Sequence, residues 1–194
     1  MRGRKSIRLK GYDYSQAGAY FITICTKGRK ELLGAIRDGK MCSSAIGRIV
    51  QECWDVLPSH YPNVQLDAFV VMPNHAHGII VILDDEPHRV RVGEGLRPST
   101  GKTRNRPPLS EIVRAFKSFS ARRINEQNGT AGQSFWQRGY YDHIIRNERS
   151  LERIREYIST NPSRWQYDRQ NTSRAITDRR DPRDGNDFLA GAFD

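Results

Sequence analysis

The chain has 194 residues, of which 37% are hydrophobic and 28% are charged, and its formal net charge is +10. This composition fits one globular domain with room for an insertion or a tail, and no apolar run is long enough to span a bilayer. Three cysteines without a C-x-x-C pair argue against a disulfide scaffold or a cysteine-based zinc site and are typical of a cytoplasmic protein. The basic excess favours a polyanionic partner such as nucleic acid, with a solvated basic surface as the alternative.

Hydrophobic patterning predicts elements in the order strand, helix, strand, strand, helix, strand, helix. The expected strands are residues 19–26, 64–71, 75–83 and 140–146. The first expected helix is residues 44–57, closed by Pro58, and the second begins at Leu109. The last helix carries Leu151, Ile154 and Ile158 and ends before Pro162.

Strands and helices that alternate in this order predict an α+β fold, a ferredoxin-like two-layer sandwich of helices packed on an antiparallel sheet. The domain is expected to cover residues 1–167. An exposed insertion is expected at about 84–108, where the composition shifts to Asp, Glu, Arg, Gly and Pro. Residues 168–194 have few apolar side chains and are expected to form a poorly ordered tail.

The sharpest motif is Pro73-Asn74-His75-Ala76-His77-Gly78. Side chains two residues apart on a strand point to the same face, so His75 and His77 can reach one metal ion. Neutral imidazole is a common metal ligand. The alternative is a pair of ordinary histidines on a half-exposed sheet, because a motif this short is weak by itself.

Tyr157 and Asn161 are four residues apart and therefore lie on one face of the last predicted helix. The Asn161 carbonyl oxygen is a hard ligand suited to Mg²⁺ or Mn²⁺. Tyr157 lies off the apolar stripe and is a candidate nucleophile, whose phosphotyrosine product would keep the bond energy for rejoining. A tyrosine hydroxyl is largely protonated at neutral pH, and a metal would polarise the phosphate that it attacks. A surface tyrosine beside a helix-ending Asn-Pro is the alternative.

Basic and aromatic side chains elsewhere are candidates for contacts with DNA. The candidates are Arg4, Lys5, Arg114, Lys117, Arg122, Arg123, Trp136 and Arg138. Stacking of Trp136 on a base would contribute about 1–3 kcal/mol. Equally, Trp136 could be a core residue and the basic positions after Leu109 a solvated helix face.

Four motifs spread in order over residues 10–167 resemble the HUH single-tyrosine transposases, in particular the REP-associated tyrosine transposases. They are Tyr20-Phe21-Ile22-Thr23, Val71-Met72-Pro73-Asn74-His75-Ala76-His77, Phe135-Trp136-Gln137-Arg138-Gly139-Tyr140-Tyr141-Asp142-His143 and Tyr157-Ile158-Ser159-Thr160-Asn161-Pro162. The insertion and the tail match no part of that family.

The resemblance implies that Tyr157 attacks single-stranded DNA to give a 5′-phosphotyrosine and a free 3′-OH. It implies that His75, His77 and Asn161 bind Mg²⁺ or Mn²⁺. It also implies palindromic hairpins as partners and a monomer, whereas the insertion-sequence branch of the family implies a homodimer.

Other functions fit the motifs less well. A cupin would place a carboxylate soon after the two histidines, but none occurs before Asp84. Two-histidine phosphoesterases repeat an H-x-Thr or H-x-Ser motif, which this chain lacks. A domesticated hairpin-binding protein that has lost cleavage is the main alternative. It would bind hairpin DNA equally well with a chelator and would never become covalently linked.

Overall fold

The computed structural model describes residues 11–84, 106–168 and 170–171. Its main sheet has four antiparallel strands in the order β4–β5–β1–β6. The strands are β1 (Gly18–Cys25), β4 (Val64–Met72), β5 (His75–Ile82) and β6 (Tyr141–Ile145). Two long helices complete the unit, with α1 (Ala45–Asp55) between β1 and β4 and α3 (Leu109–Asn128) between β5 and β6. This order and connectivity are ferredoxin-like, so the predicted fold class is confirmed.

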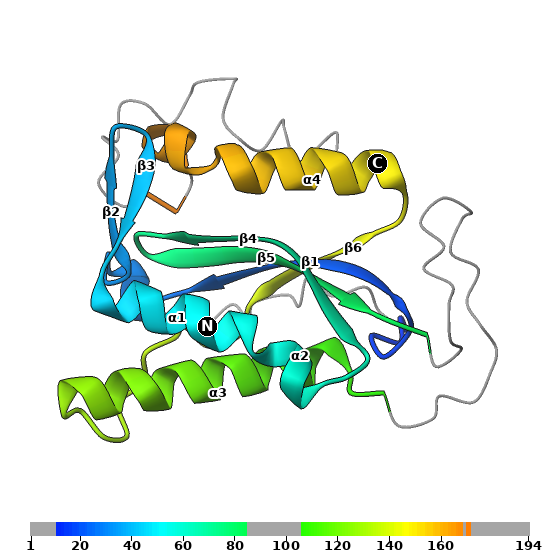
Figure 1. The fold of residues 1–194 in the computed structure, drawn as a ribbon, viewed down its shortest axis with the longest axis horizontal. Coiled ribbons are helices and arrows are strands. Elements are labelled where there is room, and N and C mark those ends of the chain that lie inside the picture. Colours follow the sequence, from blue (N-terminus) through cyan, green and yellow to red (C-terminus); the bar gives the residue numbers. More distant parts are fainter. Residues whose placement is uncertain (1–10, 85–105, 169, 172–194) are drawn as a thin grey trace, which may run out of the picture.

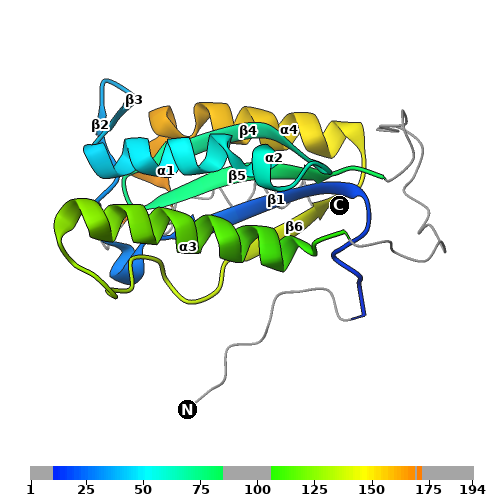
Figure 2. The same cartoon turned by 60° about the horizontal axis from the view of Figure 1, so that its bottom comes forward.

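The sheet separates two apolar cores, because alternate side chains of each strand point to opposite faces. The larger core lies between the sheet and helices α1 and α3 (Figure 1; Figure 2), and Ile22, Ile80, Trp54 and Phe116 are buried in it. Helix α4 (Glu148–Thr160) covers the opposite face and adds a layer that the sequence analysis had not placed. No helix in the described part of the chain combines the length and hydropathy that a membrane crossing needs.

A narrow apolar stripe and one ion pair hold helix α4 on the sheet. Leu151, Ile154 and Ile158 pack on Phe21 and Ile79 in the smaller core. Asn147 precedes the helix as its N-cap, and its side chain accepts a hydrogen bond from the Ser150 N–H.

The ion pair joins α4 to an irregularity in β4. Arg155 donates two hydrogen bonds, of 2.9 and 2.6 Å, to the carboxylate of Asp67. Asp67 lies where the β4–β5 register shifts between Leu66 and Phe69. This paired geometry fixes the position of α4 along the strand, and with it the position of Tyr157.

Several elements differ from the sequence prediction. A two-stranded hairpin, β2 (Gly34–Arg37) and β3 (Lys40–Ser43), precedes α1 and was not predicted. Pro58 does not close the first helix. Helix α1 ends at Asp55, and Pro58 lies in the first turn of a short helix α2 (Leu57–His60), where its missing N–H costs nothing. After α4 the chain forms a 3-10 helix, η2 (Pro162–Tyr167).

The predicted insertion lies mostly outside the described residues. Its two described ends meet, because Arg106 donates to the carboxylate of Asp84 at 2.9 Å. Of the predicted tail, Asp168, Gln170 and Asn171 are described, and all three make hydrogen bonds to the domain or to one another. The folded part therefore continues at least to Asn171.

Gly78 allows helix α1 to approach the sheet closely. An added Cβ would lie 2.5 Å from the Trp54 ring and 2.8 Å from the Phe69 ring, and these two rings stack at 4.3 Å. We expect Gly78→Ala to lower the free energy of unfolding by about 1–3 kcal/mol, the usual cost of overpacking. Urea unfolding measures this change. In a Trp54→Phe background the same substitution should cost less, and equal costs in both backgrounds would rule out this contact as the cause.

Candidate metal and nucleophile site

His75 and His77 lie at the start of strand β5, on the face that α4 covers. In the register of the sheet, His75 pairs with Cys25 and His77 with Thr23 on β1. Both rings are buried, with exposed fractions of 0% and 3%. The two histidines therefore share one face of the sheet, as predicted. That face is buried, whereas the alternative interpretation expected two ordinary histidines on a half-exposed sheet.

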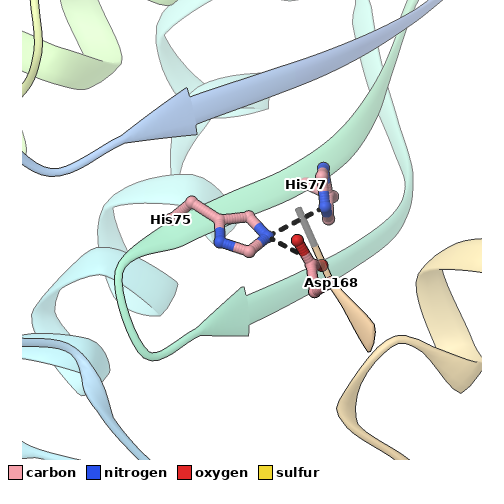
Figure 3. A group of neighbouring side chains, drawn as sticks. All are labelled: His75, His77 and Asp168. Carbon is pink, nitrogen blue, oxygen red and sulfur yellow. Dashed lines mark hydrogen bonds and ion pairs between the residues drawn. The ribbon is translucent and has the colours of Figure 1, made fainter. Parts of the chain in front are cut away.

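Three potential ligands come together at this point (Figure 3). The Nε2 atoms of His75 and His77 are 2.9 Å apart, and His75 Nε2 lies 3.8 Å from Oδ2 of Asp168. One donor atom from each of the three residues lies within 4.8 Å of the other two. Asp168 follows η2 directly, and its side chain is 6% exposed.

The chemistry of these groups fits a divalent cation. Asp168 Oδ2 and Asn161 Oδ1 are buried acceptors with no hydrogen-bond partner among the described residues. Adjacent ligands of an octahedral ion at about 2.1 Å lie about 3 Å from each other, close to the separation of the two Nε2 atoms. Asn161 also hydrogen-bonds Asp168, which brings the predicted amide ligand next to this carboxylate. Two nitrogens and two oxygens therefore form a plausible donor set.

Burial sets the protonation of both rings. It lowers the pKa of His77 to about 3, and it lowers the pKa of His75 well below the ordinary value, with smaller contributions from His77 and Arg29. Both imidazoles are therefore neutral at neutral pH and keep a lone pair for a ligand bond. Burial raises the pKa of the Asp168 carboxyl, while a hydrogen bond from the Gln170 N–H opposes that shift.

The predicted nucleophile lies beside this cluster. The Tyr157 hydroxyl is 3.4 Å from Nε2 of His77, and the two rings meet edge to face at 5.2 Å between centroids. Phe21 stacks on His77 and also contacts the edge of the Tyr157 ring. Tyr157 is half-buried. Tyr157 and Asn161 were predicted to share one face of the helix because they are four residues apart. In the structure both lie beside the histidine cluster.

Two charged residues near the cluster were missed by sequence reasoning. Asp168 was assigned to the tail, because its surroundings in the sequence are polar. Arg29 lies close enough to His75 and Asp168 to lower the pKa of each. Its backbone is in the left-handed region with φ of 56°, which is rare for a residue other than glycine and often marks a functional site. No motif in the sequence signals either residue.

The residues predicted to contact DNA lie in several parts of the fold. Trp136 is 5% exposed, its indole N–H donates to Ser120 at 2.9 Å, and its ring packs on Phe116 and Phe135. Of the two roles expected for Trp136, its burial favours core packing, because the ring would have to leave the core to stack on a base. Arg4 and Lys5 lie outside the described residues.

The basic residues of α3 lie on the helix layer opposite to α4, across the sheet from the two histidines. Lys117 donates to the carbonyls of Gln137 and Gly139, and Arg123 forms an ion pair with Glu52. Arg114 and Arg122 are exposed. Lys117 nevertheless lies close enough to Cys25, the strand partner of His75, to oppose the rise that burial causes in the pKa of that thiol. Arg138 is exposed. The N–H of its neighbour Gln137 donates a hydrogen bond to the backbone carbonyl of Cys25, and Cys25 pairs with His75 in the sheet. Arg138 therefore lies near the same end of the sheet as His75.

The chain is similar to a known protein family, to a protein of known sequence and to a solved structure. A family model described as IS200-like transposase matches residues 102–161, which include Tyr157 and Asn161. An uncharacterized protein of Haemophilus influenzae is 41% identical over 171 residues, which are 85% of this chain and 91% of that protein. A solved REP-associated tyrosine transposase bound to a REP hairpin has a similar fold, with a TM-score of 0.54 and 18% identity, over 82% of this chain and 74% of that chain.

Proposed function

We propose that this chain, which a model of IS200-like transposases matches over residues 102–161, cleaves and rejoins single-stranded DNA through a covalent bond to Tyr157. The observation that carries this proposal is the 3.4 Å separation between the Tyr157 hydroxyl and His77, inside a group of converging metal-type ligands. A nucleophile beside a cation site is the arrangement that phosphoryl transfer needs.

The proposed reaction balances without any further reagent. The Tyr157 oxygen forms a bond to the scissile phosphorus, and the bond from phosphorus to the 3′ oxygen breaks. The phenol proton is lost and the leaving 3′ oxygen gains one, which leaves a 5′-phosphotyrosine and a free 3′-OH. Attack of a 3′-OH on the phosphotyrosine reverses these steps and releases Tyr157, so cleaved ends are rejoined with no energy source.

His75, His77 and Asp168, together with Asn161, would hold a divalent cation such as Mg²⁺ or Mn²⁺. A cation at this place would polarise the scissile phosphate and offset its developing charge. The residues of the chain supply the rest. Phe21 and His77 hold the Tyr157 ring in place, and the Arg155–Asp67 pair fixes the helix that carries it.

Hairpin-forming DNA is the proposed substrate. The net charge of +10 favours a polyanion, and the similar fold of a transposase bound to a REP hairpin supports a palindromic one. Three exposed basic residues, Lys27, Lys30 and Arg138, lie near the end of the sheet where Cys25 of β1 pairs with His75 of β5. They join the α3 residues as proposed candidates for phosphate contacts.

A covalent-trapping assay tests the proposal. The chain is mixed with labelled single-stranded hairpins, including the palindromes that flank its own gene, in Mg²⁺, in Mn²⁺ and in chelator. We expect a protein–DNA adduct that forms only with the metal. Tight hairpin binding without an adduct in any metal would favour the domesticated binding protein instead.

A further inference from the structure

Asn74 lies in the turn between β4 and β5, and its exposed fraction is 0%. Its side-chain Nδ2 donates to the backbone carbonyls of Arg29, at 3.2 Å, and Gln170, at 2.6 Å. Its Oδ1 lies 2.8 Å from Nδ1 of His75. A carbonyl oxygen can only accept, so the two backbone carbonyls require the NH₂ group of Asn74 on their side. The orientation of the amide is therefore determined by its partners.

The amide orientation determines which nitrogen of His75 carries the proton. Asn74 Oδ1 can only accept, so the 2.8 Å contact requires N–H at Nδ1. A neutral imidazole has a single N–H, which leaves a lone pair at Nε2, the atom that faces His77 and Asp168. We propose that Asn74 is a positioning residue that fixes His75 in the Nδ1–H tautomer and so presents its Nε2 lone pair to a cation.

His77 has no such fixed partner. Its Nδ1 lies 2.8 Å from the hydroxyl of Thr23, and a hydroxyl can donate or accept as its hydrogen rotates. Thr23 therefore allows either tautomer of His77. The backbone of Asn74 is held as well, because its carbonyl accepts from the N–H and the hydroxyl of Thr26. Of the two rings, only His75 has its proton assigned by a rigid neighbour.

The functional consequence rests on the proposed metal role of His75. Partners that hydrogen-bond the second nitrogen of a histidine ligand typically change metal affinity 10–100-fold, because they select the tautomer and the orientation of the ring. Without Asn74, the ring would lose this selection and would adopt the other tautomer for part of the time.

Nitrogen NMR of the full chain tests the tautomer directly. With ¹⁵N-labelled histidine and a chelator present, we expect His75 to show a protonated Nδ1 and an unprotonated Nε2. Its signals are assigned from their absence in His75→Gln. A proton on Nε2 of His75 in the natural chain would overturn the proposal without any variant at Asn74.

Two substitutions at Asn74 separate tautomer control from simple support of the turn. Asn74→Leu removes every side-chain hydrogen bond of this position, and we expect a mixture of tautomers and about 10–100-fold weaker Mn²⁺ binding by calorimetry. Asn74→Asp keeps an acceptor for Nδ1–H but loses both donors to the backbone. We expect it to keep the Nδ1–H tautomer and to bind Mn²⁺ more tightly than the leucine variant does.

Equal damage from the aspartate and leucine variants would mean that Asn74 only braces the backbone, and the proposal would fall. Thr23→Val is the matched control, since it removes the partner of the other ring and should leave the His75 tautomer unchanged. These measurements use no DNA. A chain with the expected tautomers but no adduct with any hairpin would remove the proposed function and leave the role of Asn74 intact.

Discussion

Replacing Tyr157 with phenylalanine is expected to abolish the covalent adduct, with cleavage reduced on the order of a thousandfold or more, as for other lost nucleophiles. The substitution removes one oxygen and keeps the ring. Its packing on Phe21 and His77 should therefore survive, and hairpin binding should stay nearly unchanged. Gel analysis of the trapped product and a binding titration in chelator measure the two quantities separately. Cleavage by Tyr157→Phe at the natural rate would refute the assignment of the nucleophile.

Tyr141 provides the matched control for this experiment. It lies on β6, pairs with Thr23 and contacts the edge of the Phe21 ring, so it shares the face of the sheet with the histidines. We expect Tyr141→Phe to form the adduct, because it keeps the Tyr157 hydroxyl that lies 3.4 Å from Nε2 of His77. An adduct that is lost in Tyr141→Phe and retained in Tyr157→Phe would identify the strand residue as the nucleophile instead.

The fold was predictable where periodicity is strong. The alternation in β4 and the three-four spacing in α1 and α3 gave elements close to those observed, and their order gave the ferredoxin-like arrangement. The β2–β3 hairpin was missed because its strands are short and largely exposed, and they lack a clear apolar face. Its turn did carry a signal. Asp38-Gly39 have φ of 50° and 71°, as a tight hairpin turn requires, and Asp-Gly is a typical sequence for it.

The site was predictable only within single elements. The period of a strand placed His75 and His77 together, and the period of a helix placed Tyr157 with Asn161. The two pairs meet only because α4 packs over the sheet, and no local sequence pattern determines that packing. Asp168 joins them through the turn of η2, at a point where the sequence is merely polar. For Trp136 the sequence left two roles open, since a tryptophan suits stacking on a base and packing in a core equally well.

Replacing His77 with alanine is expected to weaken Mn²⁺ binding by more than about a hundredfold, since loss of a direct ligand should exceed the 10–100-fold effect of an outer partner. Adduct formation should fall with it. Calorimetry on the DNA-free chain measures the affinity, and hairpin binding in chelator shows whether the variant is still folded. His60→Ala is the matched control, because His60 lies on α2, away from the cluster, and its ring stacks on Phe119.

The two oxygen ligands can be distinguished in the same way. The sequence indicated Asn161, and the geometry adds Asp168 at 3.8 Å from His75. A carboxylate attracts a divalent cation more strongly than an amide does, so Asp168→Asn should weaken Mn²⁺ binding more than Asn161→Ala. The opposite order would make Asn161 the ligand and Asp168 its hydrogen-bond partner. If none of these variants changed Mn²⁺ affinity, the buried histidines would not be ligands.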